Sequence, residues 1–143
     1  MTHETLKTFG YPLTLVREYE HWCVLLRPAQ VTLGSLVMIC KQDVTQFSDI
    51  SAAAFAEMKQ VTGDIEANLV QFRQWQKINY LMLMMVDPHV HFHVIPRYSS
   101  DQSFEGTVYK DSGWPAVPQL GEAIKPEASE FENLLETLKA LWI

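Results

Sequence analysis

Three histidines stand at alternate positions in the segment HVHFHVIPRY, which covers residues 89–98. His89, His91 and His93 are three of only five histidines in the 143-residue chain. Side chains alternate between the two faces of a β-strand. If this segment is a strand, one face displays the imidazoles, and the valines and the phenylalanine between them face the protein core. The spacing therefore predicts a row of imidazoles on one face of a sheet.

Such a row of imidazoles suits three different roles. Surface histidines without a chemical role are common singly, but strict alternation is unusual. Neutral imidazoles in an H-x-H pattern can bind zinc, although a straight strand seldom directs three rings at one ion, and Asp87 is the one obvious carboxylate nearby. In phosphate chemistry, a neutral imidazole attacks phosphorus while a second one donates hydrogen bonds to phosphoryl oxygens. The residue types alone leave these roles open.

The elements on either side of the histidines indicate a hairpin. Residues 77–86, KINYLMLMMV, form a continuous apolar run that suits a central strand. Asp87 and Pro88 then supply turn chemistry, because Asp favours the first corner and Pro has a fixed φ. We expect 77–86 and 89–97 to pair as a tight antiparallel hairpin, with the imidazoles facing a shallow cleft.

The rest of the chain supplies further strands and two helices. Residues 13–20, 21–28 and 31–41 are rich in β-forming residues and read as strands. Through 48–75, apolar residues recur at steps of three and four, which predicts one long helix with a single apolar stripe. A C-terminal helix follows Pro126, which suits a first helical turn. The order of elements predicts an α+β fold, in which an antiparallel sheet of about five strands carries the long helix on one face.

Length and composition indicate one domain, 1–143, with a core at 13–98 and a C-terminal loop and helix extension at 99–143. The net charge of −6 and the lack of any run of Lys or Arg disfavour a nucleic acid polymer as partner. The N-terminus has no apolar signal segment, and the most apolar run is too short to span a membrane. Cys23 and Cys40 are isolated in the sequence, so we expect buried thiols in a cytoplasmic protein.

The segment HVHFHVI resembles the signature of the histidine triad (HIT) family, and the Pro96-Arg97 pair that follows is also typical of that family. Two further segments add to the resemblance. Residues 24–51 are similar to the early hairpin of the family and the start of its main helix, and GWPAVP at 113–118 resembles a Trp-Pro segment found in some members. The resemblance thus covers residues 13–118, and it favours a short-turn, bacterial-type branch of the family.

The resemblance implies a covalent mechanism on a small-molecule nucleotide. His91 would be the nucleophile that attacks the α-phosphorus, and water or another acceptor would then take the nucleotide from the nucleotidyl-histidine. His93 would hydrogen-bond the phosphate, and the backbone carbonyl of His89 would orient the ring of the nucleophile. A P–N bond to imidazole forms and breaks easily, so one difficult displacement becomes two easier ones. The family also implies a homodimer, and no metal for the covalent step, although the substrate can arrive as a Mg²⁺ complex.

The sequence departs from the family pattern at several candidate substrate contacts. Many members have His where this chain has Ser35, and Asp or Asn where it has Arg27. Polar residues before the triad are replaced by apolar ones such as Met85. Arg27 is either a phosphate contact or an exposed strand-end residue, and Asp87 is either a site residue or part of a turn. Trp114 either lies near the pocket or fills a surface groove in a proline-stiffened loop. Two alternative functions therefore stay open, a metal-dependent enzyme and a nucleotide-binding protein with weak catalysis.

Overall fold

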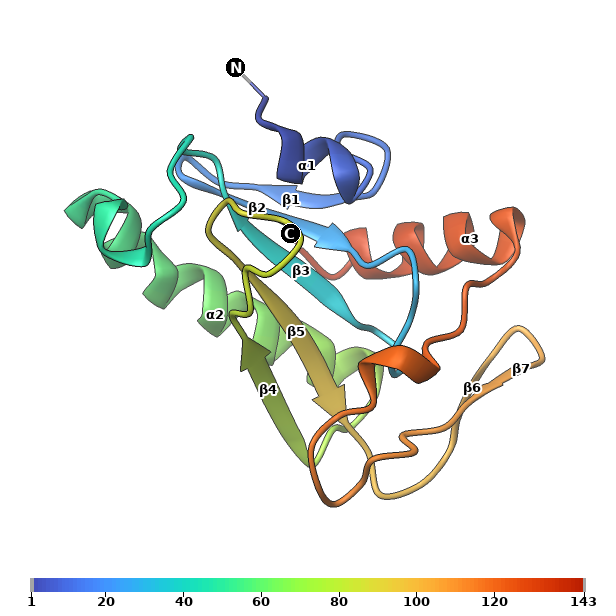
Figure 1. The fold of residues 1–143 in the computed structure, drawn as a ribbon. Helices are drawn as coiled ribbons and strands as arrows, with labels where there is room; N and C mark the ends of the chain where they lie inside the picture. The colour runs from blue at the N-terminus through green and yellow to red at the C-terminus, as the bar shows by residue number, and fades with distance from the viewer. Residues whose placement is uncertain (1, 143) are drawn as a thin grey trace.

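A five-stranded antiparallel sheet organises the chain, and the computed structural model describes residues 2–142 (Figure 1). The strand order is β1-β2-β3-β5-β4. In chain order the strands are β1 (Leu15–Glu18), β2 (Trp22–Leu26), β3 (Leu36–Cys40), β4 (Lys77–Leu81) and β5 (His91–Arg97). With helices packed on this sheet, the structure confirms the predicted α+β fold.

Helix α2 (Ala52–Phe72) lies behind the sheet in Figure 1 and covers one of its faces. It begins at Ser51, whose hydroxyl accepts a hydrogen bond from the Ala54 N–H at 3.1 Å, as expected of an N-cap. A short 3-10 turn, η1 (Phe47–Asp49), precedes it, so the helix is shorter than the predicted 48–75. Its buried residues recur at helical spacing and point at the sheet: Ala54, Val61, Ile65, Leu69 and Phe72.

The core between α2 and the sheet includes the apolar residues that alternate with the histidines. Val90 and Val94 are fully buried there, and Phe92 packs against the same cluster. Trp22 of β2 is also fully buried, and its indole N–H donates to the Ala54 carbonyl at 2.8 Å. Full burial of one such apolar side chain contributes about 1.5–3 kcal/mol. The histidines must therefore occupy the opposite face of β5, as the alternation predicts.

Helix α3 (Ala128–Lys139) adds the C-terminal part of the chain to this core. Leu134 and Leu138 are fully buried in the same cluster as α2. The Trp142 indole N–H donates to the Tyr19 hydroxyl at 2.9 Å, which joins the end of the chain to the β1–β2 turn. The predicted C-terminal extension is thus packed against the main sheet. None of the helices between residues 2 and 142 combines the length and apolar character needed to cross a membrane.

A small hairpin in the region predicted as loop was missed by the sequence analysis. Strands β6 (Gln102–Phe104) and β7 (Thr107–Tyr109) form a separate two-stranded sheet. Both residues of its turn, Glu105 and Gly106, have positive φ, which matches the twist of a two-residue hairpin. Glu is uncommon at such a position, so the usual Asn-Gly signal is absent. The hairpin docks on α3, because Glu130 accepts hydrogen bonds from the Thr107 and Tyr109 hydroxyls.

The connection before the histidine strand is longer than predicted. Strands β4 and β5 do pair antiparallel, but the last pair is Leu81 with His93. Residues 82–90 then form an irregular connection, so the prediction of a tight turn at Asp87-Pro88 was wrong. The apolar run looked like a continuous strand, yet Met85 is 86% exposed and lies outside the sheet.

A short N-terminal helix, α1 (Glu4–Thr8), covers the face of the sheet opposite α2 (Figure 1). Leu6 packs there in a second cluster of buried residues, Cys23, Leu25, Val37 and Ile39. The helix starts at His3, whose Nδ1 accepts a hydrogen bond from the Leu6 N–H at 3.3 Å. A helix of five residues is too short for its periodicity to show in a sequence.

Both cysteines are free and buried, as predicted. They lie on adjacent strands but on opposite faces of the sheet. Cys40 belongs to the cluster under α2, whereas Cys23 belongs to the cluster under α1. Burial raises the pKa of both thiols, to about 12 for Cys23, which keeps them protonated and unreactive.

Candidate active site

The register of the central strands places the histidine rings on the face covered by α1. His93 pairs with Val37 and His91 pairs with Ile39, and both β3 residues belong to the cluster under α1. The His91 and His93 ring centroids are 5.1 Å apart, with the planes at 83°. His89 lies just before the strand. All three residues are buried, with His91 only 2% exposed.

The ring of His91 is held in one orientation by the backbone of its neighbour. Its Nδ1 lies 2.6 Å from the carbonyl oxygen of His89. A carbonyl only accepts, so Nδ1 carries a proton, and in the neutral ring Nε2 keeps a free lone pair. Nε2 has no hydrogen-bond partner in residues 2–142, and no buried side-chain nitrogen or oxygen there lacks one, so Nε2 reaches the surface. This is the protonation state that a nucleophilic imidazole requires.

His93 has the opposite tautomer. The Arg27 Nε–H donates to its Nδ1 at 3.4 Å, and since a guanidinium only donates, the proton of His93 is on Nε2. Burial, followed by the charge of Arg27 and the neighbouring titratable ring of His91, lowers the pKa of His93 to about 4. His93 is therefore neutral at pH 7 and offers an N–H donor. Adjacent rings thus present a lone pair and a donor, as attack on phosphorus and stabilisation of its oxygens require.

Acidification is expected to destabilise the fold through His93. The folded ring stays neutral down to its pKa of about 4, whereas the unfolded ring takes up a proton near ~6.5. Between these values the unfolded state binds more protons, so the free energy of unfolding falls with decreasing pH by at most about 1.4 kcal/mol per pH unit from this group. The free energy of unfolding, measured in urea at several pH values, should depend less on pH in His93→Asn than in the wild type. Identical slopes would contradict the prediction.

The ring of His89 is enclosed by residues from elsewhere in the chain. Its Nε2 lies 2.7 Å from Oδ1 of Asp43, and its Nδ1 lies 2.9 Å from the Thr5 hydroxyl. One face stacks on the ring of His3, with centroids 3.9 Å apart and planes at 6°. His89 therefore has contacts on both nitrogens and on one face.

An aromatic side chain from the N-terminal segment covers the other two rings. The Phe9 ring lies 5.7 Å, between centroids, from both His91 and His93. The imidazoles thus lie on the face of the sheet that carries α1 and Phe9.

Four residues of the site were missed by the sequence analysis: His3, Thr5, Phe9 and Asp43. The rarity of histidine in the chain was the one signal that pointed to His3. The others are ordinary residues in weakly patterned segments, so no local signal connected them to the triad.

Two of the predicted substrate contacts lie at the end of β2 and start of β3. Arg27 reaches the triad through its hydrogen bond to His93. The Ser35 hydroxyl instead donates to the Thr32 carbonyl at 2.8 Å and accepts from the Thr32 N–H at 3.0 Å, and Ser35 is fully buried. Its hydroxyl stabilises the loop before β3, and this placement gives no support to a substrate contact.

The predicted contacts Met85 and Asp87 lie in the irregular connection 82–90. Met85 is exposed and Asp87 is half-buried. Neither makes a hydrogen bond to a triad histidine in the described part of the chain. Their roles toward a substrate stay predictions.

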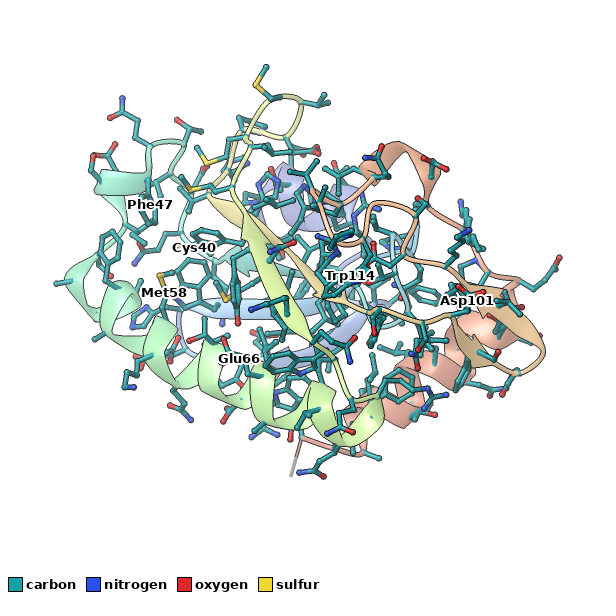
Figure 2. All side chains as sticks on the ribbon, turned by 90° about the horizontal axis from the view of Figure 1, so that it is seen from below. Cys40, Phe47, Met58, Glu66, Asp101 and Trp114 are labelled. Atoms are coloured by element: carbon teal, nitrogen blue, oxygen red, sulfur yellow. The ribbon has the colours of Figure 1, made fainter. Side chains whose placement is uncertain are left out.

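Trp114 lies in the loop that follows β7 and is half-buried (Figure 2). Its backbone N–H donates to the backbone carbonyl of Asp111 at 3.2 Å. The Asp111 carboxylate in turn pairs with Arg97 at the end of β5, at 2.7 Å. The loop is therefore anchored at the opposite end of β5 from His91, and no ring contact joins Trp114 to the triad in residues 2–142.

The geometry does not favour the alternative of a metal held by the three histidines. Within residues 2–142, no group of three or more His, Cys, Asp or Glu side chains is placed to share an ion. Nδ1 of His91 is committed to a carbonyl, and both nitrogens of His89 have protein partners. The donor atoms therefore point to different partners rather than to one centre.

Known proteins provide an independent comparison. The HIT domain family model matches residues 12–100. Among solved structures, a histidine triad protein from Bradyrhizobium japonicum has a TM-score of 0.73 at 19% identity, covering 98% of this chain and 96% of that one. A hypothetical histidine triad nucleotide-binding protein from Sulfolobus tokodaii has a TM-score of 0.67 at 20% identity, covering 90% and 82%. Diadenosine triphosphate hydrolase from Plasmodium falciparum has a TM-score of 0.67 at 8% identity, covering 90% and 76%. A search of curated protein sequences finds no match.

The family-model match includes the long helix, the sheet and all three alternating histidines. It spans more than half of the chain, and the solved structures share the fold. The observed α+β sheet carries the alternating histidines on one face, as the resemblance implies. The chain therefore belongs to the histidine triad (HIT) family.

Proposed function

We propose that this protein hydrolyses or transfers a nucleotidyl group through a covalent intermediate on His91. The observation that carries the proposal is the hydrogen bond from Nδ1 of His91 to the His89 carbonyl, which leaves the Nε2 lone pair free. The His93 ring lies beside His91, and Arg27 hydrogen-bonds to His93, so both would be donors for phosphate oxygens. Fold alone would not support an activity, because one fold hosts many functions.

The proposed reaction consists of two displacements at phosphorus. In the first, Nε2 of His91 bonds to the α-phosphorus, and the bond to the leaving group breaks. The leaving group keeps the electron pair and takes up a proton from solvent. The neutral His93 and the Arg27 guanidinium stabilise the charge on the phosphoryl oxygens. In the second, water or another acceptor attacks the same phosphorus and gives its proton to solvent, and the P–N bond breaks with its electron pair returning to Nε2. His91 returns to its starting state.

A turnover screen tests this proposal. Suitable substrates are adenosine 5′-phosphoramidate, diadenosine triphosphate and a nucleotide sugar, since relatives include a protein named as a diadenosine triphosphate hydrolase. We expect turnover of at least one of them well above that of His91→Ala. Tight nucleotide binding without turnover would identify a non-catalytic nucleotide-binding member instead. The absence of both binding and turnover would contradict the proposal.

Removal of metal ions is expected to leave the covalent step intact. The imidazole itself is the nucleophile, so no metal-bound water is required, and Mg²⁺ would enter only with a polyphosphate substrate. After EDTA treatment, the hydrolysis of adenosine 5′-phosphoramidate should stay within about twofold of the untreated rate. Loss of activity that returns on addition of Zn²⁺ would revive the metal-dependent alternative.

We also propose a homodimer that forms at strand β4. This strand is at one edge of the sheet, so one side of its backbone has no partner strand within residues 2–142. Exposed edges favour pairing with another chain, and a two-fold axis would join two sheets. Sedimentation at micromolar concentration should give about twice the chain mass of 16.4 kDa. A monomer at this concentration would show that the edge is protected.

The proposed substrate and location follow from the same chemistry. The net charge of −6 and the few cations at the triad suit a small nucleotide rather than a nucleic acid polymer. The free, buried thiols of Cys23 and Cys40 support a reducing, cytoplasmic location.

A further inference from the structure

We propose that Asp43 and His3 are positioning residues for the nucleophile. They hold the imidazole of His89 in place and thereby fix the backbone carbonyl that orients His91. The inference rests on the proposed function of His91. It makes the N-terminal segment and the β3–α2 connection parts of the catalytic centre, although neither reaches the reacting atoms.

The hydrogen-bond chemistry around His89 defines one state of its ring. The Asp43 carboxylate only accepts, so the neutral ring carries its proton on Nε2. Nδ1 then accepts from the Thr5 hydroxyl, and the same oxygen accepts from the His89 N–H at 3.3 Å. Rotation of the ring would break its bonds to both Asp43 and Thr5.

His3 closes the remaining side of this ring. Burial lowers the pKa of His3, which favours a neutral ring. Its Nδ1 accepts from the Leu6 N–H, so Nε2 carries the proton and donates to the Cys40 carbonyl at 2.7 Å. The imidazole is therefore fixed at both nitrogens, and it presents a flat, immobile surface on which His89 stacks.

The ring of His89 and its carbonyl are connected through a short stretch of backbone. The next residue, Val90, is fixed by two backbone hydrogen bonds. Its N–H donates to the Val44 carbonyl at 3.2 Å, and its carbonyl accepts from the Cys40 N–H at 3.0 Å. The ring contacts of His89 hold the other side of the same segment. A change in the His89 conformation would therefore turn the carbonyl that accepts from His91. Misplacement of a reacting group by about 1 Å can reduce a rate by about 10²-fold.

A substitution at Asp43 can test the positioning role without unfolding the protein. Its side chain is 83% exposed, and its bond to His89 is the one hydrogen bond that its carboxylate makes within the described residues. A single hydrogen bond contributes on the order of 1 kcal/mol to folding. Removal of this carboxylate should therefore leave a folded protein in which a kinetic effect reflects the lost contact with His89.

The kinetic test compares Asp43→Ala, Asp43→Asn and the control Asp49→Ala. Asp49 is an exposed aspartate in the same β3–α2 connection. With adenosine 5′-phosphoramidate, Asp43→Ala should lower kcat about 10–100-fold with KM within about twofold, because ground-state binding is unaffected. Asp43→Asn, which keeps an acceptor oxygen, should restore most of kcat, and Asp49→Ala should match the wild type. His3→Ala should behave like Asp43→Ala, and Lys7→Ala, on the exposed face of α1, is its control.

A second readout does not depend on turnover. The ¹⁵N chemical shifts of the His91 ring report which nitrogen carries the proton. The wild type should show only the Nδ1–H form, and Asp43→Ala and His3→Ala should show a mixture of both tautomers. If no substrate is turned over, the proposed function fails, and the tautomer of His91 alone decides this inference. An unchanged His91 tautomer in both variants overturns it, whether or not kcat falls, and so does an unchanged kcat in an active enzyme.

Discussion

Replacement of His91 by alanine is expected to reduce turnover by about 10⁴-fold or more, because removal of a covalent nucleophile eliminates the reaction path that it provides. The variant should fold normally apart from the lost ring, since its backbone pairing with Ile39 is retained. Steady-state hydrolysis of the best substrate in the screen, measured beside circular dichroism, checks both points. His21→Ala is the matched control, because His21 is the one histidine outside the site.

The nucleotidyl intermediate provides a direct check of the same prediction. Phosphoramidate bonds break in acid and survive base, so rapid quenching in base should preserve a peptide that contains His91 with the mass of one added nucleotide. This adduct should be absent from His91→Ala. His93→Ala should slow its formation by about 10²–10³-fold, the usual loss for one donor to a developing charge.

Stereochemistry at phosphorus gives the decisive outcome. Two in-line displacements leave a chiral α-phosphorus with net retention, whereas direct attack by water inverts it. Retention is expected if His91 is the nucleophile. Inversion would exclude the covalent mechanism and favour activated water instead.

Replacement of Asp111 by alanine is expected to destabilise the protein by about 3–5 kcal/mol, because it leaves the Arg97 guanidinium buried without its counter-charge. The side chains of the pair are only 4% and 2% exposed. Asp111 accepts two hydrogen bonds from Arg97, at 2.7 and 3.0 Å, and one from the Tyr98 N–H at 3.1 Å. Its loss therefore leaves several donors without partners.

Urea unfolding measures this effect against a matched control. Glu136→Ala removes an exposed carboxylate that pairs with Lys139 at 3.4 Å, and it should change stability by less than about 0.5 kcal/mol. The double variant Arg97→Met, Asp111→Leu should recover part of the loss, since it leaves no unpaired charge. A loss below about 1 kcal/mol for Asp111→Ala would show that solvent reaches the guanidinium.

The local patterns of the sequence determined most of the fold. Alternation of apolar and polar residues placed the histidines on one face of β5 and Val94 on the other, and the structure confirms both. The helical stripe of α2 was also predictable, because its spacing follows from the period of the helix itself. These features depend on residues a few positions apart, which a single sequence displays directly.

The length of the β4–β5 connection could not be predicted from neighbouring residues in the same way. Apolar residues continue beyond Leu81, so hydrophobicity alone predicted a strand that reaches residue 86. Pairing with β5 ends at Leu81, and exposed Met85 lies beyond it. Register depends on the partner strand, and no pattern within one segment contains it.

The surroundings of the three triad rings were decided only by the tertiary structure. Thr5 and Asp43 lie 84 and 46 positions from His89 in the sequence, yet each binds one of its ring nitrogens. The motif predicted His89, His91 and His93 as the site residues, but the tautomer of each ring depends on what its second nitrogen contacts. The low pKa of His93 likewise comes from burial beside Arg27, which the β2–β3–β5 pairing brings to it. Protonation and orientation are properties of the folded environment, so the sequence contained the three histidines, and the packing of distant segments around them determined their states.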